Sequence, residues 1–526
     1  MQKFQLRKPV LAAMGACAAL CASPGIVLAD NASDIQALKD QVRTMQQKID
    51  QLSGPQSSAA SAPAPSGPKK TDSGALTWNG ITLYGTVDIG VEYVSHGAPL
   101  SQTWGPGLPS FIQNFSNHSI TSVNGNGLSQ SKIGLSGVEP IPGLDGWSGV
   151  FRLETGFNPW SGRLVDGPGS LAADNGRAAA VKISAGDSSR AGQAFNGVAF
   201  AGISNKTFGT LTFGRQNGLM LDLLTKYDPQ LQAQAFSPIA LSGTSGGLGT
   251  TQTNRLDNSI KYNLQVGPAR LALIHGFGSD GYVPENSNEV TLGFDMAGFS
   301  MDALYGVIHG AVAAASLSTA QVNALNAVAP LPAWSMSNTL AATVSDDTGY
   351  SLQMSYNAKD YFPVKFYAGW ERIKFNNPSH PILAGSYDIG GYQLGPVLTG
   401  ALPPGANATT IAGIVNNTAF YSATTRQKIL QISWVGARWS VTPDFDLTVA
   451  GYGYNQKSFN VNGCTNASAT NCAGEMADIS LVADYHFTKR FDSYAGVNWS
   501  RVSNGLASGF LFTSEYSPMV GVRYNF

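Results

Sequence analysis

The chain has 526 residues, of which only 12% are Asp, Glu, Lys or Arg, well below the roughly 25% typical of soluble globular proteins. The formal net charge is −1 at pH 7, and the basic residues are not clustered as they are in proteins that bind nucleic acid, so that class of partner is excluded. A surface this poor in charge suits a protein whose outer wall contacts lipid.

Residues 1–29 have the pattern of a secretory signal peptide. A basic start precedes an apolar stretch at 10–20, and Ala29 ends a small-residue cleavage site. The alternative is a lipoprotein signal ending at Cys17, but the apolar run before that cysteine would be too short. We therefore predict export and cleavage after Ala29.

Residues 30–53 are predicted to form a coiled-coil segment, because apolar residues recur there at alternating spacings of three and four. The alternative, an isolated amphipathic helix, is weaker, since a helix of about 20 residues is marginal by itself in water. Residues 54–76 form a linker rich in Pro, Ala and Ser that cannot bury a core. The helix would link chains to one another or attach them to the cell wall. The seam consists of Ile35, Leu38, Val42, Met45, Ile49 and Leu52.

Residues 77–526 repeat a single pattern, in which apolar and polar residues alternate over segments of about ten residues. Such a period of two predicts strands with one apolar and one polar face. Sixteen segments show it: about 81–94, 129–138, 148–157, 195–204, 207–215, 256–266, 269–277, 288–297, 299–308, 348–357, 363–375, 427–440, 445–457, 475–487, 491–502 and 515–526.

The connections between these segments alternate in length, with long ones on one end of the strands and short ones on the other. Long extracellular loops and short turns are typical of outer-membrane barrels. In hydrocarbon every backbone N–H and C=O needs a partner, so a membrane sheet must close on itself. We predict an all-β, sixteen-stranded antiparallel transmembrane barrel in the outer membrane. The alternative, a soluble all-β protein, fits poorly with the low charge and the signal peptide. The apolar stretch 311–334 is expected to be a loop with a short helical piece.

Several of these segments resemble the Gram-negative general porins, especially the trimeric β-proteobacterial kind. The first strand matches through 80–88 (GITLYGTVD), and further matches are 131–137 (SKIGLSG), 151–157 (FRLETGF), 208–216 (FGTLTFGRQ) and 257–262 (DNSIKY). The resemblance spans about 77–526 and implies passive diffusion of small hydrophilic solutes through a homotrimer in outer-membrane lipid. It also implies that the loop 216–255 folds into the lumen, and that Tyr524 and Phe526 form the signal read by the barrel-assembly machinery.

A porin narrows to a constriction with acids on one side and bases on the other, since the resulting field orders water and selects solutes. Asp222 and Asp228 are the expected acids of the loop. Solvated charges without a selective role are the alternative for each candidate. The other candidates for the constriction lie on the wall. Lys132, Arg152, Glu154 and Lys261 alternate in step with the polar residues of their strands, and Arg255 lies where the loop ends.

Other charged residues are assigned by the same parity argument. Lys365 and Arg523 are expected to face the lumen, whereas Arg438 is ambiguous because it shares parity with Ile432 and Trp434. Arg215 has the parity of apolar residues, which predicts a position at a strand end or a trimer contact.

Cys464 and Cys472 are the two cysteines left after signal cleavage, and in an exported protein we expect them to form a disulfide. No histidine lies near them in the sequence, so neither a metal site nor a cofactor is predicted. A substrate-selective channel for a sugar or an organic anion is the main alternative function, and an enzyme is not expected because no acid–His or Ser–His group is evident. The aromatic residues of a sugar channel would be Tyr84, Tyr367, Tyr452, Tyr454 and Tyr494.

Overall fold

The computed structural model describes part of the chain, and most of that part is the predicted barrel. The described residues are 43, 69–70, 76–96, 119–162, 164, 194–240, 244–250, 254–278, 286–315, 323, 326–327, 341–376, 379, 428–458, 465–466, 473–507 and 512–526. The predicted signal peptide, nearly all of the coiled coil, most of the linker and both cysteines of the predicted disulfide lie outside them. By contacts between Cα atoms the chain divides into two units, 1–66 and 67–526, and the described strands all belong to the second.

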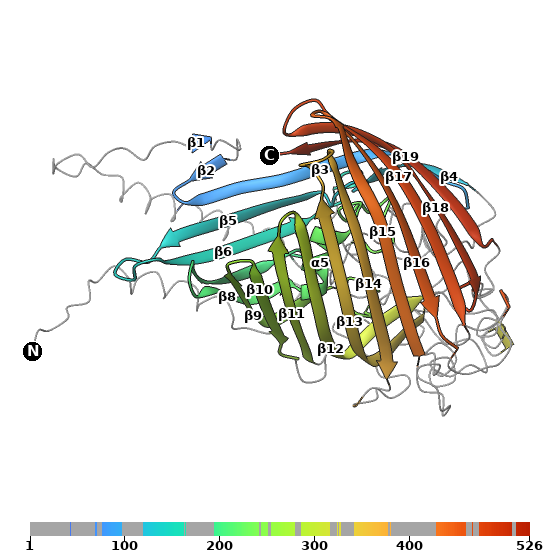
Figure 1. The fold of residues 1–526 in the computed structure, drawn as a ribbon, viewed down its shortest axis with the longest axis horizontal. Coiled ribbons are helices and arrows are strands. Elements are labelled where there is room, and N and C mark those ends of the chain that lie inside the picture. Colours follow the sequence, from blue (N-terminus) through green and yellow to red (C-terminus); the bar gives the residue numbers. More distant parts are fainter. Residues whose placement is uncertain are drawn as a thin grey trace, which may run out of the picture. The chain divides into compact units, whose positions relative to one another are not determined.

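The described strands form one antiparallel sheet that closes into a barrel (Figure 1). The wall has sixteen strand positions around its circumference. β4 and β5 pair with successive halves of β3 and together occupy the second of these positions. Their bounds are β3 Ile81–Val94, β4 Ile120–Gly125, β5 Lys132–Pro140, β6 Trp147–Gly156, β7 Ala199–Asn205, β8 Gly209–Asn217, β9 Arg255–Val266, β10 Ala269–Gly276, β11 Asn286–Met296, β12 Phe299–Ala315, β13 Ala341–Asn357, β14 Val364–Asn376, β15 Lys428–Thr442, β16 Phe445–Gln456, β17 Gly474–His486, β18 Phe491–Asn504 and β19 Ser514–Asn525.

The seam of the barrel joins β19 to β3, with Met519 opposite Glu92 and Asn525 opposite Thr86. Beyond it, the main chain of Phe526 exchanges two hydrogen bonds of 3.0 Å with Gly85. A Cβ at Gly85 would lie 2.4 Å from the Phe526 ring, so only glycine fits at this position. The seam leaves no unpaired strand edge there, as hydrocarbon requires.

Two short strands precede the barrel. β1 (Lys69–Lys70) pairs with β2 (Leu76–Trp78), and β2 turns through Asn79 and Gly80 to pair with the start of β3. Both turn residues have positive φ, 46° and 78°. An Asn-Gly pair is the sequence most suited to such a two-residue hairpin.

The side chains alternate between the two faces of the wall in the sense predicted for a membrane barrel. Along β17, Asp478 and Ser480 are buried within the barrel, whereas Ile479 and Leu481 on the opposite face are 55% and 44% exposed. An apolar face that is exposed all round a closed sheet matches a lipid environment rather than water. No helix among the described residues is long and apolar enough to cross a membrane.

The predicted sixteen-stranded barrel is confirmed, with two local corrections. The prediction missed β4, because it treated 95–128 as one loop. It also made two strands too short, because β12 continues to Ala315 and β13 already begins at Ala341, with which Ala315 pairs. The start of the expected loop 311–334 is therefore strand. A bulge after Ile308, with Gly310 at φ 67°, interrupts the alternation there and hides the continuation.

Candidate pore constriction

The segment after β8 enters the barrel and forms the helix α5 (Leu219–Tyr227), which packs against the inner faces of β10 to β14. Its sequence LMLDLLTKY places Leu219, Met220 and Leu224 against the wall, each no more than 1% exposed. The first turn is held by Glu289 of β11, whose carboxylate accepts the Met220 N–H at 3.1 Å. A carboxylate at a helix N-terminus satisfies a free N–H and interacts favourably with the helix dipole. The helix therefore lies in the lumen, as predicted for the 216–255 loop.

Asp228 ends the helix and does not line open water. It is fully buried and accepts N–H groups of Gln230 (3.1 Å) and Gln232 (2.8 Å) and the hydroxyl of Tyr452 on β16 (2.6 Å). Burial raises the pKa of the Asp228 carboxyl above its usual value, an effect that these hydrogen bonds oppose. Asp228, expected on the acidic side of the pore, therefore lies between the loop and the wall, where it fixes the turn.

The loop is attached to the wall at several further points. Trp434 donates from its indole to the carbonyl of Tyr227 at 3.1 Å, and Tyr454 donates to the carbonyl of Pro238 at 2.9 Å. Later contacts reach the far strands: Gln230 donates to Ser480 of β17 (2.8 Å), Ala235 donates from its N–H to the Gly127 carbonyl (3.1 Å), and the Phe236 ring meets Tyr494 of β18 edge-on.

One predicted group of wall residues comes together around Glu154. Lys132 of β5 and Arg152 of β6 bind the same carboxylate oxygen at 3.3 and 2.7 Å. Tyr84 completes the group, donating to Glu154 at 3.1 Å and accepting from Arg152 at 2.6 Å. The side chains of Lys132 and Arg152 are 31% and 42% exposed, whereas that of Glu154 is 7% exposed. The group thus presents its cations to the lumen, and Arg255 is close enough to interact with Glu154 as well.

A second predicted group forms where the helix meets β9. The ammonium of Lys261 binds the carboxylate of Asp222 and also donates to the Asn217 carbonyl at 3.0 Å. Asp222 is 41% exposed, and the lysine only 8%. Lys261 was expected among the bases facing the loop acids, but it lies under one of them and partly neutralises it.

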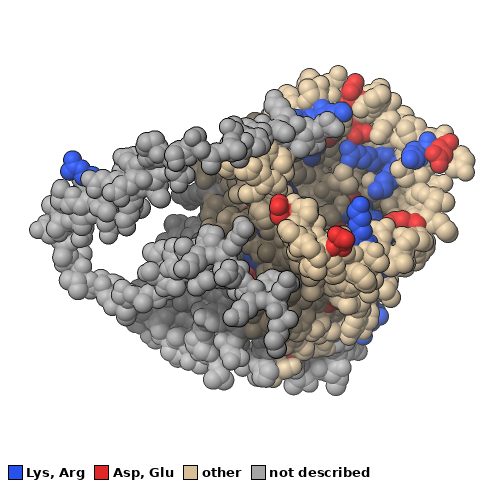
Figure 2. Space-filling model, turned by 90° about the vertical axis from the view of Figure 1, so that its left-hand side faces the viewer, with Lys and Arg blue, Asp and Glu red and all other residues tan. Residues whose placement is uncertain are grey.

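A third set of charges, which was not predicted from the sequence, lies at the end of the barrel with the short turns. Lys226 of α5 and Arg270 of β10 both bind Asp302 of β12, at 3.5 and 2.7 Å. Burial lowers the pKa of Lys226, as does the nearby Arg270, while Asp302 raises it. Figure 2 shows one face of the molecule on which Lys and Arg side chains lie interspersed with Asp and Glu.

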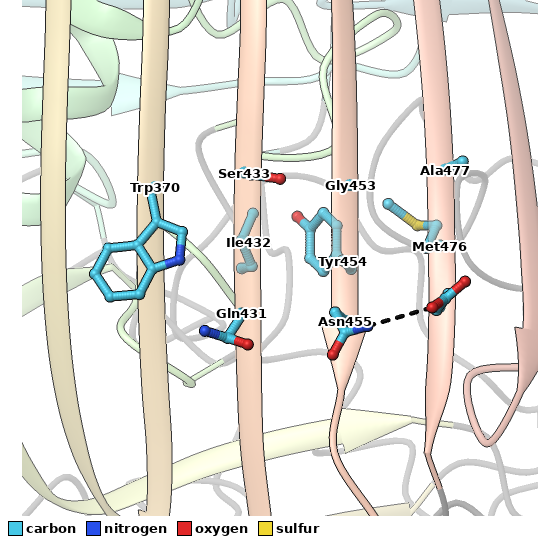
Figure 3. Close-up of a pocket in the computed structure, with 10 residues that line it drawn as sticks. Trp370, Gln431, Ile432, Ser433, Gly453, Tyr454, Asn455, Met476 and Ala477 are labelled. Carbon is cyan, nitrogen blue, oxygen red and sulfur yellow. Dashed lines mark hydrogen bonds between the residues drawn. The ribbon is translucent and has the colours of Figure 1, made fainter.

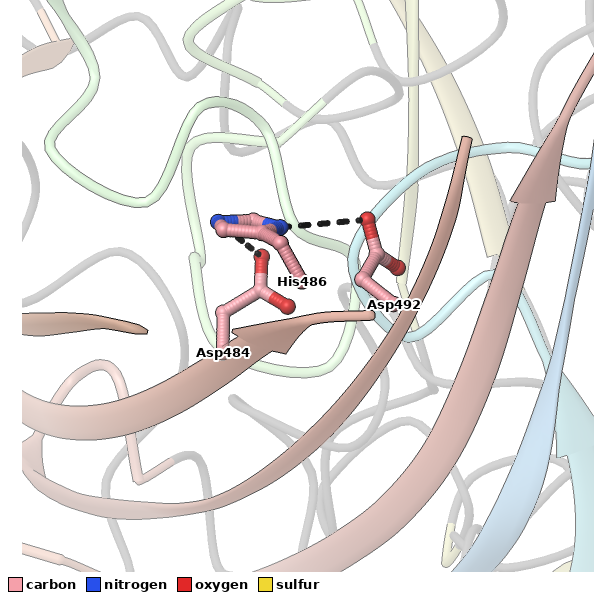
Figure 4. A group of neighbouring side chains, drawn as sticks. All are labelled: Asp484, His486 and Asp492. Atoms are coloured by element: carbon pink, nitrogen blue, oxygen red, sulfur yellow. Dashed lines mark ion pairs between the residues drawn. The ribbon is translucent and has the colours of Figure 1, made fainter. Parts of the chain in front are cut away.

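The same end contains an acid–histidine group that the sequence analysis did not identify. His486 lies 3.0 Å from Asp446. It also lies 3.7 Å from Asp492 and 4.0 Å from Asp484, and Figure 4 shows these three side chains together. The ligand atoms of Asp484, His486 and Asp492 lie within 4.8 Å of one another, a spacing compatible with a metal ion. Arg523 already binds Asp492 at 2.8 Å and Asp484 at 3.3 Å, so the group is built as an ion-pair network. All members of this group occupy the alternate strand positions that face the lumen. The alternation in the sequence could therefore have identified them.

Local packing explains the positions of two further arginines, Arg438 and Arg215. Arg438 points inward and binds Asp446 at 2.6 Å; its parity was ambiguous because Ile432 and Trp434 also point inward, under the loop. Arg215 is 7% exposed and binds Asp257 at 2.6 Å and the carbonyls of Asn196 and Gly197.

The tyrosines that could have lined a sugar-binding track make structural contacts instead. Tyr494 donates to Asp88 at 2.6 Å, and Asp88 also accepts the N–H groups of Gly127, Leu128 and Ser129, which fixes the break between β4 and β5. Tyr367, Tyr452, Tyr454 and Tyr494 are each at most 5% exposed. They do not form an open aromatic track.

A closed, outwardly apolar barrel with charged groups and a folded loop in its lumen is the architecture of an outer-membrane channel. Residues 16–505 match the family model described as Gram-negative porin, and the chain therefore belongs to the Gram-negative porin family, whose barrels lie in the outer membrane.

Individual relatives share only low sequence identity with this chain. An outer membrane porin protein of Bordetella pertussis is 27% identical over 187 residues, which is 35% of this chain and only 38% of that protein's length. An anion-selective porin from Comamonas acidovorans has 15% identity and a TM-score of 0.51, with 85% of this chain and 99% of that chain covered. The outer membrane channel DcaP of Acinetobacter baumannii has 13% identity and a TM-score of 0.44, with 88% and 100% covered. The Comamonas structure supports the fold.

Proposed function

We propose that this protein is a water-filled channel through which small hydrophilic solutes and ions diffuse passively across the outer membrane, and that it is not an enzyme. The observation that carries the proposal is the closed wall with exposed apolar side chains outside and charged ones inside, narrowed by α5. Barrels of this width leave an aqueous interior rather than a packed core. Membership of the porin family supports the same conclusion.

The test is reconstitution of the detergent-purified protein. In planar bilayers it should produce discrete, non-saturating conductance steps, and liposomes that contain it should swell in sugars up to a defined size. A channel blocked by micromolar concentrations of one solute would favour the substrate-selective alternative. Absence of any conductance from correctly folded protein would contradict both.

The filter that we propose consists of two groups with opposite exposed charges. Lys132 and Arg152 present positive charge above a buried Glu154, and Asp222 presents negative charge above a buried Lys261. In a salt gradient, Arg152→Gln should shift the reversal potential toward cation preference, and Asp222→Asn should shift it toward anion preference. Shifts of the same sign in both variants would rule out this assignment.

The proposal on assembly rests on membership of the porin family and on the pairing of the C-terminal residues at the seam of the barrel. We expect a homotrimer in outer-membrane lipid, and we expect the barrel-assembly machinery to read Tyr524 and Phe526. Cross-linking in detergent tests the trimer. Deleting residues 30–75 and measuring attachment of the barrel to the cell wall tests a role for the predicted coiled coil.

A further inference from the structure

The acid–histidine group at the end of the barrel with the short turns is assembled from directly paired strand positions. His486 of β17 pairs in register with Asp492 of β18, and Asp484 of β17 pairs with Asp446 of β16. Asp484 and His486 are two residues apart in one strand, so their side chains lie on the same face. The turn between β17 and β18 is held by Thr488, whose hydroxyl accepts two backbone N–H groups. The group is therefore positioned by a tight hairpin rather than by a long loop.

The imidazole of His486 is oriented so that Nδ1 can bind a metal ion. Its Nε2 lies 3.0 Å from a carboxylate oxygen of Asp446. Because an ionised carboxylate only accepts hydrogen bonds, Nε2 carries the proton, and Nδ1 of the neutral ring keeps its lone pair. Histidines that bind a metal through one ring nitrogen almost always donate from the other, often to a carboxylate.

The spacing around Nδ1 fits a metal ion better than a hydrogen bond. Nδ1 of His486 lies 3.7 Å from Asp492, which is beyond hydrogen-bonding distance, whereas two ligand atoms on a tetrahedral zinc ion are about 3.3–3.6 Å apart. Asp484 is only 7% exposed, and its Oδ1 has no hydrogen-bond partner among the described residues. Figure 4 shows both carboxylates beside the imidazole, with one ligand atom of each residue within 4.8 Å of the others.

The charge of the group also favours a cation. Its three carboxylates face two guanidinium groups, since Arg438 binds Asp446 and Arg523 binds the other two aspartates. With a neutral imidazole, the group therefore has one negative charge in excess. The side chain of His486 is 25% exposed, so an ion can reach it from the lumen.

We propose that Asp484, His486 and Asp492 bind a divalent transition-metal ion such as zinc, with Asp446 as a positioning residue for the imidazole. An imidazole together with carboxylates suits zinc or copper, whereas magnesium and calcium prefer oxygen ligands alone. Three protein ligands leave a coordination position for water on the lumen side. Arg523 competes with the metal for the two aspartates.

The outer face of the same strands has no comparable group among the residues that the structure describes. The notch there, between β14 and β17, is lined by one acid, Glu475, which accepts a hydrogen bond from Asn455, and by no histidine (Figure 3). Zinc binding that depends on His486 therefore reports on the inner site.

The test is calorimetric titration of the tag-free, full-length protein in detergent with zinc chloride, after treatment with a chelator. One zinc ion per chain should bind, and excess magnesium or calcium should not displace it. His486→Gln and Asp492→Asn should each weaken binding by more than about a hundredfold, and Asp446→Asn by about tenfold, because loss of an outer-shell partner costs about 10–100-fold. His309→Gln is the matched control, since His309 pairs with a single described acid, Asp346, at 3.0 Å; it should leave the affinity unchanged.

A substitution of the competing arginine should have the opposite sign. Arg523→Gln should tighten zinc binding several-fold, because it removes a cation from the same two aspartates. Equal losses in His486→Gln and His309→Gln, displacement of zinc by magnesium, or weaker binding in Arg523→Gln would overturn the proposal. Mobility on unheated gels confirms that each variant is folded. The measurement needs no current through the barrel, so its result is independent of the channel proposal.

Discussion

The wall that α5 and its loop cover differs from the wall that they leave bare, although both follow the same alternation. Under the loop, many inward positions are apolar and fully buried, as at Ile373, Ile432 and Trp434, and a charged one such as Glu289 is buried in a contact with the loop. On the bare wall, the inward positions carry charge that is partly exposed, as at Lys132 and Arg152. The contents of the lumen, rather than the strand itself, therefore decide which residues suit the inner face.

The largest expected effect concerns the centre of the covered wall. Trp434→Ala should lower the free energy of unfolding by about 3–5 kcal/mol, because it leaves a cavity and removes the hydrogen bond to Tyr227. Urea titration in phospholipid vesicles, with folded fraction read from gel mobility, measures it. Trp439→Ala is the control, since Trp439 lies on the outer face of the same strand and is 46% exposed; equal losses would contradict the comparison.

A smaller effect is expected at the hydroxyl that anchors the turn after α5. Tyr452→Phe removes one of the donors to Asp228 and should cost about 1–3 kcal/mol, because a buried carboxyl group loses one of its hydrogen bonds. The same titration applies, and increased open-channel noise should accompany the loss. Tyr485→Phe, on the outer face of β17 and 45% exposed, should leave both readings unchanged.

The pH dependence of loop attachment follows from Asp228. Its pKa is raised in the folded protein, so its contribution to stability is complete below the ordinary aspartate pKa of about 3.9 and is lost as the pH rises through the raised value. Relative to Asp228→Asn, which does not titrate there, the wild type should therefore gain stability as the pH falls from neutral. A constant difference between the two across this pH range would disprove the assignment.

The smallest effect on stability is expected on the bare wall. Lys132→Gln should change the free energy of unfolding by less than about 1 kcal/mol, since the pair is partly exposed and Glu154 keeps Arg152. It should nevertheless shift the reversal potential toward cations. Lys206→Gln, exposed in a short turn, is the control and should shift neither quantity.

The same comparison explains what the sequence could and could not predict. Strand positions followed from alternation and turn residues, so β3 was predicted with its observed bounds of Ile81–Val94. The site was predicted less well, because parity identifies inward positions but not what covers them. Arg438 was ambiguous for this reason, and Asp228 was expected in open water. The contact of Lys261 with Asp222 depends on the path of the loop, which no local pattern encodes.

The attachments of the loop span much of the circumference, from Glu289 on β11 through Trp434 and Tyr452 to Ser480 on β17 and Gly127 near the seam. A thin cylinder without an internal tie is easily flattened into an oval. Here the segment that narrows the passage is also the brace that keeps the cylinder round. A mutation that widens the passage by shortening this segment would therefore also soften the cylinder, so permeability and rigidity cannot change independently.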